Sequence, residues 1–567
     1  MSARELITEH LDLWTGAVTK KSSSGRGSSG KVELTGIKKL RELILELAVR
    51  GSLVDQDPSD ESAQELLERC LRAKADSVEL GKLKKARKHA AITSDDTPFG
   101  LPQGWVWSRL DDLVRVINGR AYKKHEMLSS GTPLLRVGNL FTSNDWYYSD
   151  LELEEDKYID SGDLIYAWSA SFGPFIWDGG RAIYHYHIWK LDLFDGEAVD
   201  KRFLYLYLKA ITEEIKSSGS GIAMVHMTKA KMEELIVPVP PLEEQHRIVQ
   251  KVDELMALCD RLEQQTSDQL EAHETLVDTL LGTLTQSESA TELADNWARL
   301  AAHFDTLFTT EQSIDKLQQT VIELSVRGFL VSTNDDGGEP AEILLNRLRN
   351  EKQRLIAIKK AKDNGKIHQK APKEPPYDIP SSWTWVRFRE LIWCYRGHNP
   401  PKSEFKTEPQ PGYVRFIQIT DFKTDANKVF VPQTSRNKMV HKGEIIMAAY
   451  RHIGKLSRNM EGAFNVALCK ILEFEPMERD FVELLIRTDL VTGELLRASE
   501  RGHIPSMHSD HLLSLLVPLP PLVQQRKIVK RVAELATLCD RLKERLNQAS
   551  ETRCQLAKTI VEQGLSA

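Results

Sequence analysis

Three short stretches of this 567-residue chain carry residue types that could do chemistry. The first is GRGSSGKV at 25–32, which partly matches the phosphate-binding loop motif, because a second glycine and a lysine follow Gly25 at the spacing that the motif requires. That loop needs a serine or threonine next, to hold magnesium, and a β-strand before it. Val32 takes the position and no strand pattern precedes it, so we interpret the stretch as part of a flexible basic linker at 20–31.

The second stretch is HNPPKS at 398–403. It is similar to the Asn/Asp-Pro-Pro-aromatic motif with which amino-methyltransferases hold a flipped adenine. Lys402 stands where an aromatic ring should stack on the base, and no cofactor-type glycine loop follows a strand upstream. We therefore expect a proline turn at this position.

The third set consists of histidines. They are HYH at 185–187 and, further along, His503, His508 and His511. No acidic or cysteine ligands fall beside them at helical spacing, so surface or core histidines are expected here in place of a metal site. Since no nucleophile, base and orienting group come together either, we predict no catalytic, cofactor-binding or metal residues in this chain.

The composition is that of a soluble, folded protein, with 41% hydrophobic and 28% charged residues. No run approaches the roughly 18–20 apolar residues of a membrane span, and the first residues lack the apolar core of a signal peptide, so a cytoplasmic protein without membrane contact is expected. Six cysteines form no CxxC pair and are expected to be reduced thiols. They are Cys70, Cys259, Cys394, Cys469, Cys539 and Cys554.

A long internal repeat organises the chain. VPVPPLEEQHRIVQKVDELMALCDRLEQ at 237–264 returns as VPLPPLVQQRKIVKRVAELATLCDRLKE at 517–544, with 16 of 28 positions identical. Four further matches keep the same order at nearly the same offset, for example LPQGWVWSRLDDLV at 101–114 and IPSSWTWVRFRELI at 379–392. The chain is therefore an internal duplication of a unit of about 280 residues.

Within each unit a charged, helix-periodic part precedes a part rich in Gly, Pro, aromatic residues and short β-type runs. The fold class expected is α+β, with two mixed α/β domains and long helices. The expected domains are an N-terminal helix and flexible linker at 1–35, a helical region at 36–97, a mixed domain at 98–241, a long helix at 242–290, a second helical region at 291–375, a second mixed domain at 376–521 and a final long helix at 522–567.

Apolar residues after each proline segment step by four and three, which is the spacing of a heptad seam. The predicted seam consists of Ile248, Val252, Leu255, Cys259 and Leu262 in the first copy and Ile528, Val532, Leu535, Cys539 and Leu542 in the second. A continuous helix from 242 to 286 would be about 65 Å long. An amphipathic helix packed on its own domain is the alternative, but the length and duplication of the seam favour pairing of the two long helices.

Two similar domains on paired helices suit double-stranded DNA, whose major-groove faces recur about 34 Å apart. The frame is nearly the same in both copies and the interiors differ, so two different half-sites separated by unread bases are expected. The net charge of −6 argues against a bulk nucleic-acid binder, although a patch can be basic and a partner can supply phosphate contacts.

Loop clusters of Arg, Lys, His, Asn, Gln and Ser at matching positions are the candidate DNA contacts. In the first domain they are Asn118, Arg120, Lys123, Lys124, Arg136, Asn139, Ser218, Ser220, His226, Lys229 and Lys231. In the second they are Arg396, His398, Lys402, Gln418, Thr420, Tyr450, Arg451, His452, Lys455, Arg501, His503, Ser506 and His508.

The chain resembles the specificity (S) subunit of type I DNA restriction–modification systems over essentially its whole length. The resemblance rests on the two proline-bordered segments that end in LCDRL, on the Trp-x-Trp openings of both mixed domains, and on GIKKLRELILELAVRGSLV at 36–54. The last phrase, with the residues before it, is similar to the subgroup with an N-terminal extension.

This resemblance implies two target recognition domains and an antiparallel coiled coil between them. It also implies a non-catalytic subunit that binds two methyltransferase (M) subunits, which use S-adenosylmethionine to methylate adenine N6 after flipping the base. Restriction (R) subunits would add cleavage driven by ATP with magnesium. A coiled-coil scaffold without DNA specificity is the alternative, and a single-chain methylating enzyme is a second.

Overall fold

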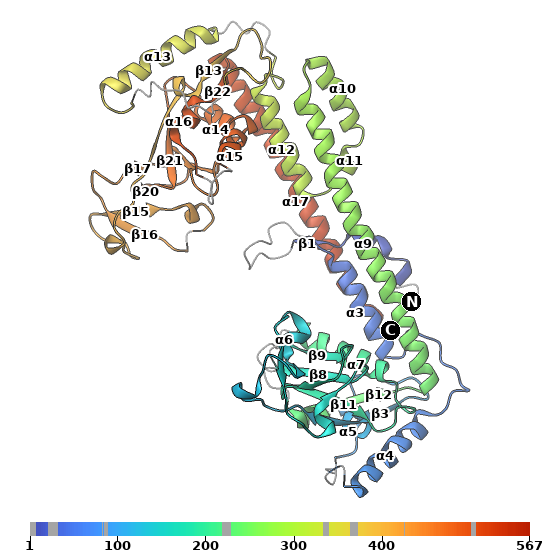
Figure 1. The fold of residues 1–567 in the computed structure, drawn as a ribbon. Coiled ribbons are helices and arrows are strands. Elements are labelled where there is room, and N and C mark those ends of the chain that lie inside the picture. The colour runs from blue at the N-terminus through green and yellow to red at the C-terminus, as the bar shows by residue number, and fades with distance from the viewer. Residues whose placement is uncertain are drawn as a thin grey trace. The chain divides into compact units, whose positions relative to one another are not determined.

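A computed structural model gives the structure of this chain (Figure 1). It describes residues 7–20, 32–81, 83, 89–169, 171–217, 228–332, 339–362, 372–424, 426–499 and 506–566. The predicted linker at 20–31 and the glycine stretch at 25–32 lie, apart from Lys20 and Val32, outside the described residues. The chain forms two compact units, one of residues 1–269 with 548–567 and one of residues 270–547.

The helices of the first unit precede its mixed domain. They are α2 (Leu11–Gly16), α3 (Thr35–Val49) and α4 (Ala63–Glu79). The spacing of Leu40, Leu43, Ile44 and Leu47 predicts one buried helical face, and all four side chains are buried in α3, which confirms it.

The first mixed domain is built on two four-stranded sheets and a two-stranded one. Its strands are β3 (Val106–Arg109), β4 (Val114–Asn118), β5 (Thr132–Leu135), β6 (Tyr147–Ser149), β7 (Tyr158–Ile159), β8 (Leu164–Ser169), β9 (Ser171–Ile176), β10 (Ala182–Tyr184), β11 (Ile188–Leu193) and β12 (Ile236–Val239). The sheets have the orders β4-β11-β8-β9 and β6-β5-β10-β7, and β3 pairs with β12. The helices α5 (Leu110–Leu113), α6 (Val137–Phe141), α7 (Lys201–Ser217) and α8 (Lys229–Glu233) connect them.

The second unit repeats this topology strand for strand. Its strands are β13 (Thr384–Arg387), β14 (Ile392–Arg396), β15 (Tyr413–Ile417), β16 (Val429–Pro432), β17 (Met439–Val440), β18 (Ile445–Ala448), β19 (Leu456–Ser457), β20 (Gly462–Phe464), β21 (Leu468–Glu473) and β22 (Leu516–Leu519). The sheet orders β14-β21-β18-β19 and β16-β15-β20-β17 match those of the first domain, and β13 pairs with β22. Its helices are α10 (Ala290–Ala301), α11 (Phe304–Leu307), α12 (Glu311–Val326), α13 (Ala341–Ala357), α14 (Arg479–Arg487), α15 (Glu494–Ser499) and α16 (Ser509–Ser514). The predicted α+β class with an internal duplication is confirmed.

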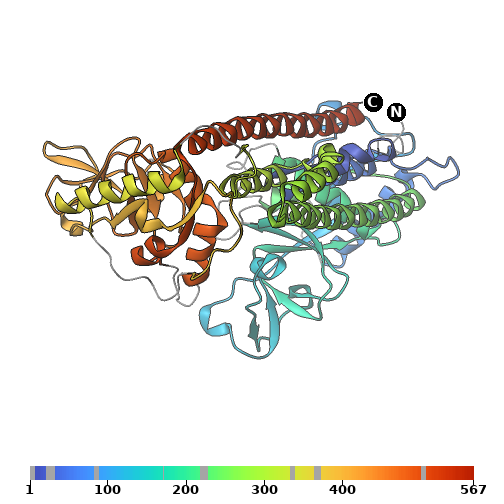
Figure 2. The same ribbon diagram turned by 90° about the horizontal axis from the view of Figure 1, so that it is seen from above.

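Two long helices follow the proline segments, α9 (Leu242–Gln286) and α17 (Leu522–Ser566), each of 45 residues. Both are drawn as continuous helices in Figures 1 and 2. The first half of α9 shares a hydrophobic core with α3 and with Ala557, near the end of α17. The last turns of α9, at Val277 and Leu281, share a core with Cys539 of α17. Within each unit, a part of α9 thus shares a hydrophobic core with a part of α17.

All residues of the predicted seam except Leu535 lie in one of three hydrophobic cores. Ile248, Val252 and Cys259 are buried beside α3, with Leu255 and Leu262 half-buried against the same core. In the second unit Ile528 and Val532 are buried in the core of the mixed domain, Cys539 is buried and Leu542 half-buried in the core with α9, and Leu535 is half-buried. The first seam thus lies in one core of the first unit, and the second seam passes from the core of its mixed domain to the core that includes the last turns of α9. No helix in the described parts of the chain combines the length and apolarity needed to cross a membrane.

Candidate nucleic-acid interface

Several strand ends of the first mixed domain converge on one turn. β11 runs antiparallel to β4 and β8, with Trp189 opposite Asn118 and Ile188 opposite Ala167, so the ends of β4 and β8 lie beside the start of β11. β10 runs parallel to β5 and also ends there, at Tyr184. The turn that joins β10 to β11, residues 185–188, therefore stands among the last residues of four strands.

Backbone hydrogen bonds tie this turn to each neighbouring strand end. Arg120 N donates to Tyr184 O at 3.1 Å after β4, and His185 N donates to Leu135 O at 2.9 Å at the end of β5. The turn itself closes with Ile188 N donating to His185 O at 2.9 Å. Because the bonds come from separate elements, the turn is held rigidly in place.

The second domain has the same hydrogen bonds around its β20–β21 turn. His398 N donates to Phe464 O at 3.0 Å, Asn465 N to Ile417 O at 3.2 Å, and Leu468 N to Asn465 O at 3.1 Å. The ends of β8 and β18 are bound alike, since Trp168 N donates to His187 O at 3.1 Å and Ala449 N to Ala467 O at 2.8 Å. The two domains thus share one backbone framework and place different side chains on it.

A glycine makes the close approach possible in each domain. Gly119 and Gly397 lie at the end of the first strand of the framework, and a Cβ there would clash with the carbonyl oxygens of His185 and Phe464. No other residue type leaves that space, so the two glycines fix how closely strand and turn approach.

The candidate contacts of the first domain are only partly free to bind. Arg120 forms a two-bond ion pair with Glu126, at 3.1 and 2.7 Å, whose hydrogen bonds lower the pKa of that carboxyl to about 2. Arg136 has no carboxylate partner in the described ranges and lies over the ring of Tyr147 at 4.5 Å. Asn139 accepts a hydrogen bond from Arg136 N at 3.1 Å and so positions that loop.

The remaining described candidates of this domain lie at the surface. Asn118, at the end of β4 beside the turn, and the three lysines Lys123, Lys124 and Lys231 are exposed. Lys229 pairs with Glu233 at 3.4 Å and lines a cavity of about 500 Å³ together with Asn118. Ser218, Ser220 and His226 lie outside the described residues.

In the second domain several candidates meet around the turn. Arg396 donates to Val466 O at 3.2 Å and to Met507 O, so it links the turn to the segment at Met507. Gln418 directly follows Ile417, which accepts from the turn, and Tyr450 pairs with Ser506 through an isolated β-bridge. The exposed candidates are Lys402, Thr420, Arg451, His452, Lys455 and His508, with His398 half-buried. Arg501 and His503 lie outside the described residues.

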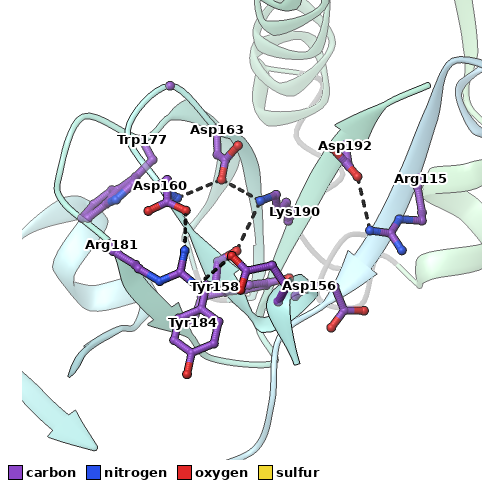
Figure 3. Close-up of polar contacts among 12 residues, drawn as sticks. Arg115, Asp156, Tyr158, Asp160, Asp163, Trp177, Arg181, Tyr184, Lys190 and Asp192 are labelled. Atoms are coloured by element: carbon purple, nitrogen blue, oxygen red, sulfur yellow. Dashed lines mark hydrogen bonds and ion pairs between the residues drawn. The ribbon is translucent and has the colours of Figure 1, made fainter. Parts of the chain in front are cut away.

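Ion pairs hold several acidic residues of the first domain at the strand ends away from the turn (Figure 3). Asp163 pairs with Lys190 at 2.7 Å, and Arg181 pairs with Asp160 at 2.9 Å while lying over the ring of Tyr158. Asp160, Asp163 and Arg181 precede β8 and β10, whereas the turn lies after these strands. These acidic side chains are therefore paired with cations at the strand ends opposite the turn.

The sequence did not single out the aromatic surroundings of the turn. Tyr186 is 40% exposed, and the centroid of its ring lies 3.9 Å from that of the His187 ring and 4.5 Å from that of the His185 ring. Trp168 stands beside Tyr186 and stacks on Trp189 at 5.5 Å. Burial lowers the pKa of His185 to about 4 and lowers that of His187, so both rings are neutral at pH 7.

A signal for this site was present in the sequence. AIYHYHIWKLDL at 182–193 aligns with GAFNVALCKILE at 462–473 in the repeat, where Lys190 matches Lys470 and every residue of the turn differs. Among the described residues no group of three metal-ligating side chains occurs, at HYH or elsewhere.

Comparison with known proteins identifies the class. The model of the type I restriction modification DNA specificity domain matches residues 102–272 and again 380–551, which together cover most of both repeats. The chain belongs to this family of type I specificity subunits.

Two relatives from Escherichia coli match along their entire length. The type I restriction enzyme EcoEI specificity subunit is 35% identical over 609 residues, and that of EcoAI is 32% identical over 602, each covering 100% of both chains. A solved structure, the HsdS subunit from Thermoanaerobacter tengcongensis, aligns with 82% of this chain and 98% of its own at 18% identity, with a TM-score of 0.38.

Proposed function

We propose that this chain gives a type I restriction–modification complex its DNA sequence specificity. Each mixed domain acts as a target recognition domain and reads one half of an asymmetric bipartite site in double-stranded DNA. The observation that carries this proposal is the shared backbone framework of the two strand-end clusters, which hold different side chains in the same geometry. A framework of this kind suits two readers with different base preferences.

The chemistry is assigned to partner subunits. Two methyltransferase subunits dock on the helical regions and use S-adenosylmethionine to methylate adenine N6, and restriction subunits add ATP- and magnesium-dependent cleavage. This chain binds none of these cofactors in our proposal. It acts in the cytoplasm, on the cell's DNA and on invading DNA.

The partners also account for the modest positive charge of the interface. Arg120 is neutralised by Glu126 and Arg396 is used on backbone carbonyls, so these two arginines beside the turns are not available to phosphates, and exposed cations such as Lys123 and Lys402 remain. Most of the phosphate contacts, which dominate the salt dependence of DNA binding, then come from the methyltransferase subunits.

The test is selection of duplexes from a random library by the purified chain, alone and with its methyltransferase subunits, over a salt series. We expect enrichment of one bipartite sequence by the complex. A complex that assembles but enriches no sequence at any salt concentration would support the scaffold alternative. Methyl transfer by the chain alone would support the single-chain enzyme.

A further inference from the structure

The tip of the turn is the same structural position in both domains. Tyr186 follows His185 in the β10–β11 turn, and Val466 follows Asn465 in the β20–β21 turn. Both residues are 40% exposed, although valine is usually buried and tyrosine is on average about half-buried. Two chemically different side chains thus protrude from one shared framework.

The backbone of each tip is already fully used. Tyr186 N donates to Arg120 O at 3.0 Å, and Tyr186 O accepts from Trp168 Nε1 at 2.9 Å. In the second domain Val466 N donates to Asn399 Oδ1 at 3.2 Å, and Val466 O accepts from Arg396 at 3.2 Å. Different residues thus satisfy the backbone N–H and carbonyl of the tip residue in the two domains. Only the side chain of that residue is left to contact a ligand.

We propose that the tip residue reads one base pair of the half-site bound by its own domain, Tyr186 by a hydrogen bond to a base edge and Val466 by contact with the methyl group of a thymine. This inference rests on the proposed function, since it assigns the base contact within the recognition domains.

The chemistry of each tip side chain supports this assignment. The phenol of Tyr186 can donate or accept a hydrogen bond, and its ring is held by His185 and His187, so little rotamer freedom is lost on binding. The turn is uncharged at neutral pH, which suits contact with bases more than with phosphates. Val466 offers methyl groups alone, and in the major groove only thymine presents a methyl group to meet them.

The experiment uses the complex with its methyltransferase subunits and duplexes that carry its selected site, each position varied in turn. For Tyr186→Ala and Tyr186→Phe we expect preference at one position of one half-site to fall about 10- to 100-fold, with the other half-site and the spacing unchanged. The salt dependence of affinity should stay as in the wild type, because no phosphate contact is lost. Trp146→Ala, which removes an exposed ring of the same domain that lies beside Trp177, is the matched control and should change nothing.

Val466 is tested by replacing each thymine of the second half-site with uracil, which removes only the methyl group. We expect one such replacement to weaken wild-type binding several-fold and to have a smaller effect on the Val466→Ala complex. Leu496→Ala, at an equally exposed aliphatic residue of α15 in the same domain, serves as control.

The outcomes separate the two proposals. A wild-type complex without any selected site would overturn both. A selective wild type whose Tyr186 variants keep every base preference, or lose affinity uniformly with a smaller salt dependence, would overturn the tip assignment and leave the proposed function standing. Uracil tolerated at every position of the second half-site would overturn the assignment of Val466.

Discussion

The buried amide of Gln245 donates from Nε2 to the carbonyl oxygen of Pro240 at 2.9 Å, and thereby joins the start of α9 to the proline segment before it. Its Oε1 accepts from Asp200 N at 2.7 Å, at the start of α7. Gln525 repeats both bonds in the second unit, to Pro520 O at 2.9 Å and from Glu478 N at 3.1 Å. One glutamine in each half thus fixes a recognition domain to its long helix.

Gln245→Ala should therefore loosen the first unit. It leaves the N–H of Asp200 and the carbonyl of Pro240 buried without their partner, which costs about 1–3 kcal/mol of unfolding free energy. Urea unfolding followed by circular dichroism measures the change, and hydrogen exchange in α7 locates it. Gln250→Ala, at an exposed position of α9, is the control. Equal stability of the two variants would contradict the role of the buried amide.

Glu244, the neighbour of Gln245, makes the first unit sensitive to pH. Trp105 Nε1 donates to its Oε2 at 3.0 Å, its Oε1 is buried without a partner in the described structure, and burial raises the pKa of the carboxyl. The contribution of Glu244 to the stability of the unit should be fully present below the ordinary carboxyl pKa of 4.5 and be lost as the pH rises through the raised folded-state pKa.

Glu244→Gln should remove this loss. It keeps an acceptor for Trp105 without the buried charge, and Gln524 does the same for Trp383 in the second unit. We expect the variant to gain about 1 kcal/mol at pH 8 and little at pH 4.5. The reciprocal Gln524→Glu should lose stability at pH 8, as measured by urea unfolding at both pH values. If either variant differed from the wild type in unfolding free energy by the same amount at both pH values, the charge of the carboxyl would not be the cause.

A lysine on the strand that follows each turn, β11 or β21, is expected to stabilise its domain. Lys190 pairs with Asp163 and donates to Tyr158 O at 3.3 Å, while Lys470 pairs with Glu444 at 2.5 Å and donates to Met439 O at 3.3 Å. Both lysines are largely buried.

Lys190→Met leaves Asp163 without its partner, so we expect a loss of about 1–3 kcal/mol. Arg115→Met is the matched control, because Arg115 pairs with the more exposed Asp192 at 3.3 Å on the same sheet and should matter by less than about 1 kcal/mol (Figure 3). Thermal unfolding of the two variants compares them directly. A larger loss of thermal stability in Arg115→Met than in Lys190→Met would show that the pair of Lys190 with Asp163 is not what stabilises the sheet.

The architecture could be predicted from the sequence because its signals are local. Heptad spacing and duplication indicate the long helices, and the α3 face follows from four leucine and isoleucine positions. The recognition site could not be predicted to the same degree, since it depends on strand pairing. Only the register of β10 and β11 shows that HYH stands at the centre of the cluster, and only the ion pair with Glu126 shows that Arg120 is occupied.

The most direct test of the central claim is exchange of one recognition domain. β3 and β12 pair with Val106 opposite Val239, so the first domain begins and ends at one place, and residues 98–241 can be replaced by the matching segment of the EcoEI relative. Methylome sequencing of a host that expresses the exchanged chain with its partners reads the outcome. We predict a new sequence in one half-site, with the other half-site retained. A change in both halves, or in neither, would contradict the assignment of one half-site to each domain.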